Sequence, residues 1–161
     1  MTIHSQMNLA DYVNANLAFR YSRIGTKIVT AIGILFAVVV VYFTIVYPEG
    51  VDFTMYIAPA ILIFLPLVSN YFMVRLNYKS NTRMGELMEY IFSDDYLSIK
   101  GESFSTQFTW EKIYKVTQTS NWIFIWQNRQ NANPIAKKNF TESEITELKT
   151  ILDFHQVKHN L

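Results

Sequence analysis

Two uncharged apolar runs of membrane length, Ile28–Tyr47 and Phe53–Val74, constrain this chain more than any other feature. The first run has 20 residues and the second has 22, and only the five residues of Pro48–Asp52 separate them. At a rise of about 1.5 Å per residue, each run forms a helix of about 30 Å, which is the thickness of the hydrocarbon core of a bilayer. The sequence therefore predicts a transmembrane hairpin over residues 28–76, with Pro59 and Pro66 bending its second helix.

The charges beside the two runs predict the orientation of the hairpin. Cations precede the first run and follow the second, whereas the connector carries the two acids Glu49 and Asp52 and no cation. Because lysine and arginine in short loops stay on the cytoplasmic side, both termini are predicted to be cytoplasmic. The cations expected at this membrane surface are Arg20, Arg23, Arg75 and Lys79.

Residues 1–27 are predicted to form a cytoplasmic amphipathic helix centred on residues 8–24. Leu9, Tyr12, Val13 and Leu17 recur at steps of three and four residues, which gives one mostly apolar face. This helix either lies along the inner membrane surface or packs on the domain that follows, and the sequence leaves both alternatives open.

The second apolar run contains two adjacent polar residues, Ser69 and Asn70, one turn after Pro66. Polar groups in hydrocarbon are costly and usually find partners. We expect Asn70 to bond to the first span, to a second copy of the chain, or to the carbonyl that Pro66 leaves free. Intramembrane packing is therefore the predicted role of Pro66, Ser69 and Asn70, and a homo-oligomer is one of its forms.

After the hairpin, the apolar period changes from that of a helix to that of strands. Residues 77–161 are predicted to form one small α+β domain in which an antiparallel sheet is closed by a C-terminal helix. Thr141 and Glu144, which have the spacing of a capping box, predict the start of this helix, and an apolar stripe follows them. The predicted strands are Leu87–Phe92, Tyr96–Lys100, Phe104–Trp110, Tyr114–Thr119 and Trp122–Gln127, with a short sixth at Pro134–Ala136.

Several of these features together resemble the YcxB-like bacterial membrane proteins. The residues that carry the resemblance are Leu9–Tyr12, Trp110–Ile113, Phe124–Trp126, Lys137–Phe140 and the Thr141–Leu152 helix. The chain departs from the family at Ala136, where a proline is common. The resemblance implies a pleckstrin-homology-like (PH-like) cytoplasmic domain in the bacterial inner membrane, and it implies no established activity.

The sequence offers no chemistry for an enzyme. Residues 77–161 contain ten cations and ten acids, so there is no basic face for nucleic acid. With no cysteine, the chain has neither a thiol nucleophile nor a thiolate metal site. No glycine-rich phosphate loop and no nucleophile elbow is present, and we expect no catalytic residue, metal or cofactor.

The predicted function is therefore binding, by the PH-like domain, of a protein partner of unknown identity or of the anionic membrane surface. Lys137 and Lys138, on the turn before the last helix, are the residues expected to dock the domain on anionic lipid. Two further alternatives stay open: an immunity protein against a membrane-targeting bacterial toxin, and an accessory subunit of a transporter.

Overall fold

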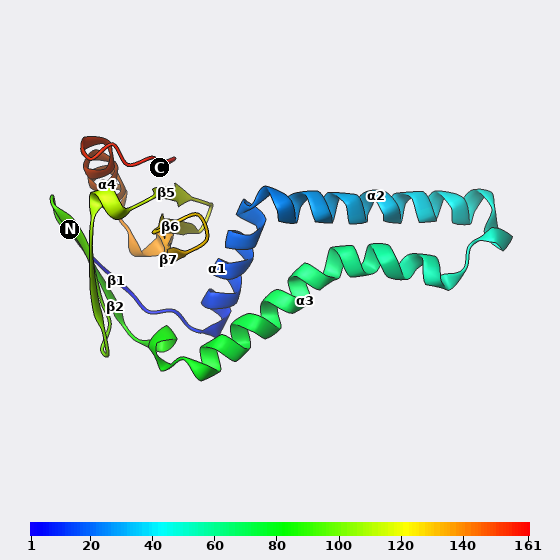
Figure 1. The fold of residues 1–161 in the computed structure, drawn as a ribbon, viewed down its shortest axis with the longest axis horizontal. Coiled ribbons are helices and arrows are strands. Elements are labelled where there is room, and N and C mark those ends of the chain that lie inside the picture. The colour runs from blue at the N-terminus through cyan, green and yellow to red at the C-terminus, as the bar shows by residue number, and fades with distance from the viewer. The chain divides into compact units, whose positions relative to one another are not determined.

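The computed structural model describes the backbone of residues 1–161 and all side chains except that of Thr82 (Figure 1). The chain forms two compact units. One unit contains Tyr12–Ser80, and the other combines Met1–Asp11 with Asn81–Leu161.

The Tyr12–Ser80 unit is built on two long antiparallel helices, α2 (Ile24–Val46) and α3 (Ile57–Ser80). The short 3-10 turns η1 (Pro48–Gly50) and η2 (Phe53–Tyr56) connect them. The helices approach closely at Gly33, where an added Cβ would lie 2.9 Å from the Cβ of Leu62. The antiparallel arrangement of α2 and α3 confirms the predicted hairpin. The close approach of the two helices at Gly33 requires a residue without a side chain.

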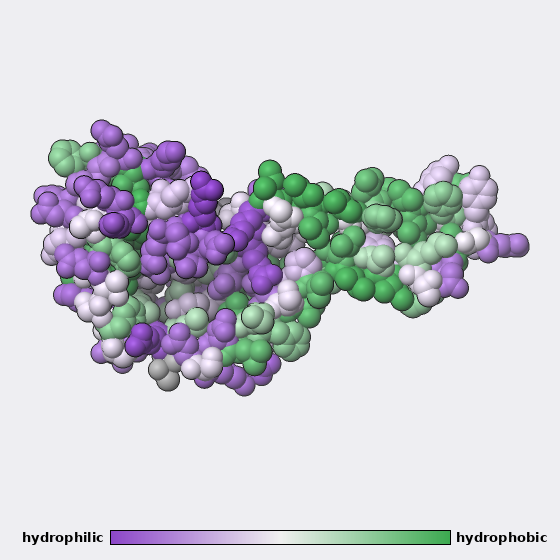
Figure 2. All heavy atoms as spheres, viewed as in Figure 1, coloured by the Kyte–Doolittle hydropathy of each residue, from purple (hydrophilic) through white to green (hydrophobic). Residues whose placement is uncertain are grey.

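The two helices are long and apolar enough to cross a membrane. A helix from a soluble core would be mostly covered by its own chain, but only 6% of the most apolar window of α2 is buried, and 17% of that of the second segment. Figure 2 shows the resulting hydrophobic surface along the hairpin, with hydrophilic residues at its connecting end. Two candidate transmembrane helices are therefore present.

The two prolines of α3 act differently. Pro66 lies inside the helix, where it removes a backbone hydrogen bond, and Figure 1 shows α3 bent along its length. Pro59, which was also expected to bend the helix, lies in its first turn. Amide groups there have no partner within the helix, so a missing N–H costs little.

The other unit contains seven strands in two antiparallel sheets. The first sheet has the order β1-β2-β3-β4, and the second has the order β5-β6-β7. All six predicted strands are present, although a single sheet was expected; the short 3-10 turn η4 (Trp110–Lys112) separates the two sheets. The strands are β1 (Thr2–Ser5), β2 (Met88–Phe92), β3 (Tyr96–Lys100), β4 (Ser105–Thr109), β5 (Lys115–Gln118), β6 (Trp122–Trp126) and β7 (Ala132–Ala136).

The strand β1 was not predicted. It pairs antiparallel with β2, so that Thr2 lies opposite Ile91 and Ser5 opposite Met88. Ile3 is 2% exposed and enters the core. The helical hairpin is thus inserted between two neighbouring strands of one sheet, whereas the sequence placed residues 1–27 in a segment separate from the domain at 77–161.

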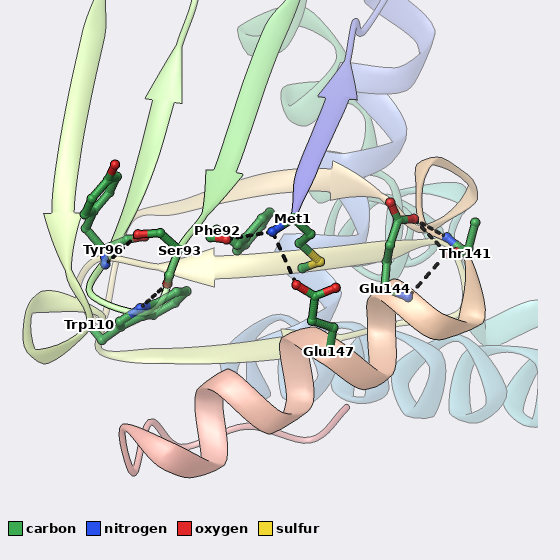
Figure 3. Close-up of polar contacts among 8 residues, drawn as sticks. All are labelled: Met1, Phe92, Ser93, Tyr96, Trp110, Thr141, Glu144 and Glu147. Carbon is green, nitrogen blue, oxygen red and sulfur yellow. Dashed lines mark hydrogen bonds and ion pairs between the residues drawn. The ribbon is translucent and has the colours of Figure 1, made fainter.

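The helix α1 (Leu9–Ser22) follows β1, and α4 (Glu142–Phe154) closes the core. The predicted capping box of α4 is present: the Thr141 amide donates to Glu144 Oε2 at 2.7 Å, and the Glu144 amide donates to Thr141 Oγ1 at 3.3 Å (Figure 3). Leu148, Ile151 and Leu152 of α4 are buried against the sheets. The capping box and the apolar stripe therefore predicted this helix correctly.

Candidate functional site

The cations of the helical unit lie at one end of the hairpin. Because α2 and α3 are antiparallel, the beginning of α2 and the end of α3 meet at the same end, to which α1 leads (Figure 1). The guanidinium of Arg23 lies 4.6 Å from the centre of the Phe19 ring. All cations of Tyr12–Ser80 belong to this basic end: Arg20, Arg23, Lys27, Arg75 and Lys79.

The basic end is held together by contacts between α1 and α3. Asn70 is 2% exposed, and its Nδ2 donates to the carbonyl of Val13 at 3.3 Å. The rings of Tyr12 and Tyr78 pack with their centres 5.6 Å apart. Burial, and then the neighbouring Tyr78, raises the pKa of Tyr12 to about 12, so its phenol stays protonated at neutral pH.

The structure gives Asn70 a partner that was not expected. The amide bonds to α1, the helix before the first span, and not to the first span or to the carbonyl near Pro66. Bonding of Asn70 to a second copy of the chain stays a prediction. Ser69 donates to the carbonyl of Pro66 at 3.3 Å, within its own helix. Of the three residues predicted to pack within the membrane, Asn70 is the one whose side chain bonds to another helix.

Lys137 and Lys138 lie in the other unit, in the 3-10 turn η5 (Lys137–Asn139). Lys137 is half-buried, and its Nζ donates to Gln118 Oε1 at 2.8 Å. Its amide also donates to the carbonyl of Asn121 at 2.8 Å. Lys138 is exposed. Of this predicted lipid-docking pair, therefore, Lys137 is tied to the β5 strand and Lys138 is the more accessible charge.

Trp110 and the aromatic residues of β6 are interior residues of the sheet unit. Trp110 is 1% exposed, and its Nε1 donates to the carbonyl of Ser93 at 3.0 Å, beside the turn that Ser93 makes with Tyr96 (Figure 3). All five residues of β6, the central strand of its sheet, are buried. Tryptophans and phenylalanines at these positions therefore build the domain and do not form an exposed patch.

A cluster of contacts joins the segment after α3 to the β3–β4 turn. The Glu86 carboxylate accepts from the amide of Ser103 at 3.0 Å and from its hydroxyl at 2.6 Å. These bonds hold the pKa of Glu86 below its usual range. Arg83 lies over the Phe104 ring, and Gln6 Nε2 donates to the carbonyl of Gly85 at 3.1 Å. The two chain segments that lead to the helical hairpin are thus bonded to each other. These contacts were not predicted from the sequence, because they join residues up to 79 positions apart.

The opposite end of the hairpin contains an apolar groove of about 640 Å³. The exposed acids Glu49 and Asp52 belong to the connector beside it. Sequence reasoning missed the groove, because it depends on how α2 faces the connector. The groove is lined by Phe36, Val39, Val40 and Phe43 of α2, by Tyr47, Gly50, Val51 and Met55 of the connecting segment, and by Ala58 of α3.

No metal-binding cluster is seen among the residues that the structure describes. The His155 ring nitrogen Nε2 contacts the carbonyl of Asp94, and the ring stacks on Trp110. His159 Nε2 lies 2.9 Å from Asp153 Oδ1. Both histidines thus make contacts that attach α4 and the segment after it to the rest of the domain.

Part of the chain is similar to a known protein family. Residues 92–152, which are 61 of the 161 residues, match the family model described as YcxB-like protein. The matched segment runs from the end of β2 through most of α4 and excludes the helical hairpin. No curated protein and no solved structure matches the chain.

Proposed function

We propose that this chain, whose residues 92–152 form a YcxB-like protein domain, is a non-enzymatic bacterial inner-membrane protein that holds a binding domain at the cytoplasmic surface. The observation that carries the proposal is the insertion of the apolar hairpin between β1 and β2. Two chain segments therefore leave the same end of the sheet for the hairpin, since Ser5 lies opposite Met88. Two chain segments, and not one, therefore connect the domain to the hairpin.

A PH-like assignment for this domain is supported by its strand count. A sheet of four strands, a sheet of three strands and one C-terminal helix follow one another along the chain. The first of the seven strands, β1, comes from before the hairpin.

A cytoplasmic location of both termini is supported by the charges of the helical unit. Its five cations lie at the basic end, and its two acids, Glu49 and Asp52, lie in the connector. Positive residues in short loops are retained on the cytoplasmic side, so the connector is assigned to the outer face.

Cysteine labelling tests this orientation, because the chain has no cysteine of its own. In intact spheroplasts, Gly50→Cys should react with a membrane-impermeant maleimide. Asn128→Cys, in the exposed β6–β7 loop, should react only after the membrane is permeabilised. Equal labelling of both variants in intact spheroplasts would contradict the orientation.

The ligand that the basic end fits best is anionic lipid. A cation held near an anionic membrane surface contributes about 1 kcal/mol, so several neighbouring cations make a substantial binding energy. The contact of Asn70 with Val13 fixes α1 beside α3, so that Arg20 of α1 belongs to the same end of the unit as Arg75 and Lys79 of α3. The binding should weaken as salt screens these charges.

The experiment uses the full chain, purified in mild detergent with equal amounts of phosphatidylglycerol and phosphatidylcholine. Mass spectrometry of the retained lipid should show enrichment of phosphatidylglycerol. Arg75→Gln with Lys79→Gln should reduce that enrichment about fivefold per cation, the ratio for ~1 kcal/mol. The matched control, Lys112→Gln with Lys149→Gln, removes two exposed cations of the other unit and should change little.

Equal retention of both lipids by the unaltered chain would overturn the lipid-binding proposal. Cross-linked co-purification from native membranes gives the second measurement. A stoichiometric protein partner found there, with no lipid preference, would instead favour an adaptor, an immunity protein or a transporter subunit.

A further inference from the structure

The apolar groove near the connector has the size and chemistry of a site for a hydrocarbon chain. Its volume of about 640 Å³ falls within the range of ~300–1,000 Å³ that is usual for small-molecule sites. Its walls combine one face of α2, including Val39 and Phe43, with Val51 and Met55 of the connecting segment. These side chains are apolar, and Tyr47 adds the single side-chain hydroxyl of the lining, so the part of a ligand that enters the groove is apolar too.

Two hydroxyl groups that neighbour lining residues in the sequence, those of Thr44 and Tyr56, are already paired. Thr44 Oγ1 donates to the carbonyl of Val40 at 2.8 Å, and the same hydroxyl is hydrogen-bonded to the Tyr56 hydroxyl. Neither hydroxyl therefore needs a partner from a ligand. A polar ligand would gain no hydrogen bond from these two groups, and a hydrocarbon chain beside them would leave no polar group unpaired.

Negative charge is concentrated in the connector that contributes to the groove. Glu49 and Asp52 are exposed and flank the lining residue Val51 and its neighbour Gly50. The Thr54 amide donates to Asp52 Oδ1 at 2.8 Å, which holds the pKa of Asp52 below its usual range and keeps this carboxylate ionised. No cation occurs between Lys27 and Arg75. A ligand with a positive head and an apolar tail matches this arrangement.

We propose that the groove seats one acyl chain of a phospholipid with a primary ammonium headgroup, whose ammonium lies against Glu49 and Asp52. Within the orientation proposed above, the lipid belongs to the outer leaflet. A second copy of the chain is a poorer occupant, because a copy inserted in the same direction would bring a second Glu49 and Asp52 to the same level of the membrane. Like charges there would oppose its association.

The first experiment tests the headgroup. The full chain is purified in mild detergent with equal amounts of phosphatidylethanolamine, phosphatidylcholine and phosphatidylglycerol, and the retained lipids are quantified by mass spectrometry. Phosphatidylethanolamine should be enriched over phosphatidylcholine at this site. In Glu49→Gln with Asp52→Asn, that enrichment should be lost, because both carboxylates that attract the ammonium are removed.

The matched control for the headgroup is Glu102→Gln with Glu111→Gln. These two acids are exposed residues of the other unit, and their removal lowers the net negative charge by the same amount. The control variant should keep the preference of the unaltered chain. Loss of the preference in the control, or no preference in the unaltered chain, would overturn the proposal.

The second experiment tests the groove with two neighbouring valines. Val39 lines the groove and is 42% exposed, whereas Val38 is 60% exposed and does not line it. Val39→Trp should fill the groove and remove the bound lipid, and Val38→Trp should retain it. The melting temperature of both variants shows whether each is folded. Equal retention of lipid by two folded variants would overturn the proposal, as would a two-chain complex that Val39→Trp dissociates.

Lipid at the basic end and lipid in the groove are measured separately. The basic-end variants change phosphatidylglycerol retention, whereas the connector variants change phosphatidylethanolamine retention. Extraction of the unaltered chain by alkaline carbonate would contradict membrane insertion itself and with it both proposals. Lipid retention that responds to the basic end alone would overturn only the groove.

Discussion

Asn70 places an amide in an apolar stretch of α3, and its partner lies 57 residues earlier in the chain. At the scale of single residues, this bond connects the second span to α1. Gly33 has the complementary role between the two long helices, since a larger residue would collide with Leu62. One polar bond and one missing side chain thus position three helices.

Asn70→Leu should destabilise the helical unit because it leaves the Val13 carbonyl without this donor. Interhelical hydrogen bonds in membrane proteins contribute about 0.6 kcal/mol on average and ~1.7 kcal/mol at most. A decrease of that size is expected in unfolding followed by circular dichroism in detergent, together with faster amide exchange in α1. Ser69→Ala is the control, because its hydroxyl bonds only within α3. An Asn70→Leu variant as stable as the unaltered chain would contradict the assignment.

At the scale of elements, α4 shows local and tertiary stabilisation together. The capping box at Thr141 satisfies amide groups at the beginning of the helix, and the buried Leu148 and Leu152 join the helix to both sheets. Glu147 of the same helix lies 3.3 Å from the main-chain nitrogen of Met1, which also donates to the carbonyl of Phe92 (Figure 3). The helix therefore closes the core beside β1 and β2.

Thr141→Ala should lower the free energy of unfolding of the domain by about 1 kcal/mol, the usual cost of removing an N-cap hydroxyl. Thr141→Ser keeps the hydroxyl and should restore nearly all of this stability. Denaturant titration of the full chain at neutral pH measures both variants. If Thr141→Ser is as unstable as Thr141→Ala, the hydroxyl is not the source of the effect.

The same capping box should make stability depend on acid pH. Bonds from Thr141 hold the pKa of Glu144 below its ordinary value of 4.5. Because the folded pKa is the lower one, the contribution of the ionised carboxylate is fully present above about pH 4.5 and is lost as the pH falls through the folded pKa. Glu144→Ala should remove this part of the pH dependence. An unchanged acid slope in Glu144→Ala would assign the dependence to other carboxylates.

At the scale of the whole molecule, the domain is discontinuous in sequence. Its first strand precedes the hairpin and its remaining six strands follow it, so synthesis of the sheet is complete only after both apolar helices have been made. Ile3 and Met7 bury apolar side chains at 2% and 7% exposure. The part of the chain after the hairpin therefore lacks a strand of its own core.

A fragment of residues 81–161 should unfold without a cooperative transition or aggregate, because β2 is left as an open edge. Joining residues 1–8 to residue 81 through a short Gly-Ser linker should restore cooperative unfolding, since Ser5 already lies opposite Met88. The same linked protein with Ile3→Asp is the control and should behave like the fragment. Equally cooperative unfolding of the fragment and the linked protein would show that β1 is dispensable.

The sequence by itself determined the features that depend on neighbouring residues: the two apolar helices, the turns that separate β2 to β7, and the cap at Thr141. Length, alternation and capping chemistry act over a few residues, so they can be read along the chain. Only the tertiary structure decided that β1 pairs with β2, that the strands divide into two sheets, and that Asn70 bonds to Val13. The pairing of β1 with β2 and the bond from Asn70 to Val13 join residues 57 or more positions apart. Their stabilising free energy comes from burial and hydrogen bonding in the folded chain, so no local sequence pattern predicts them.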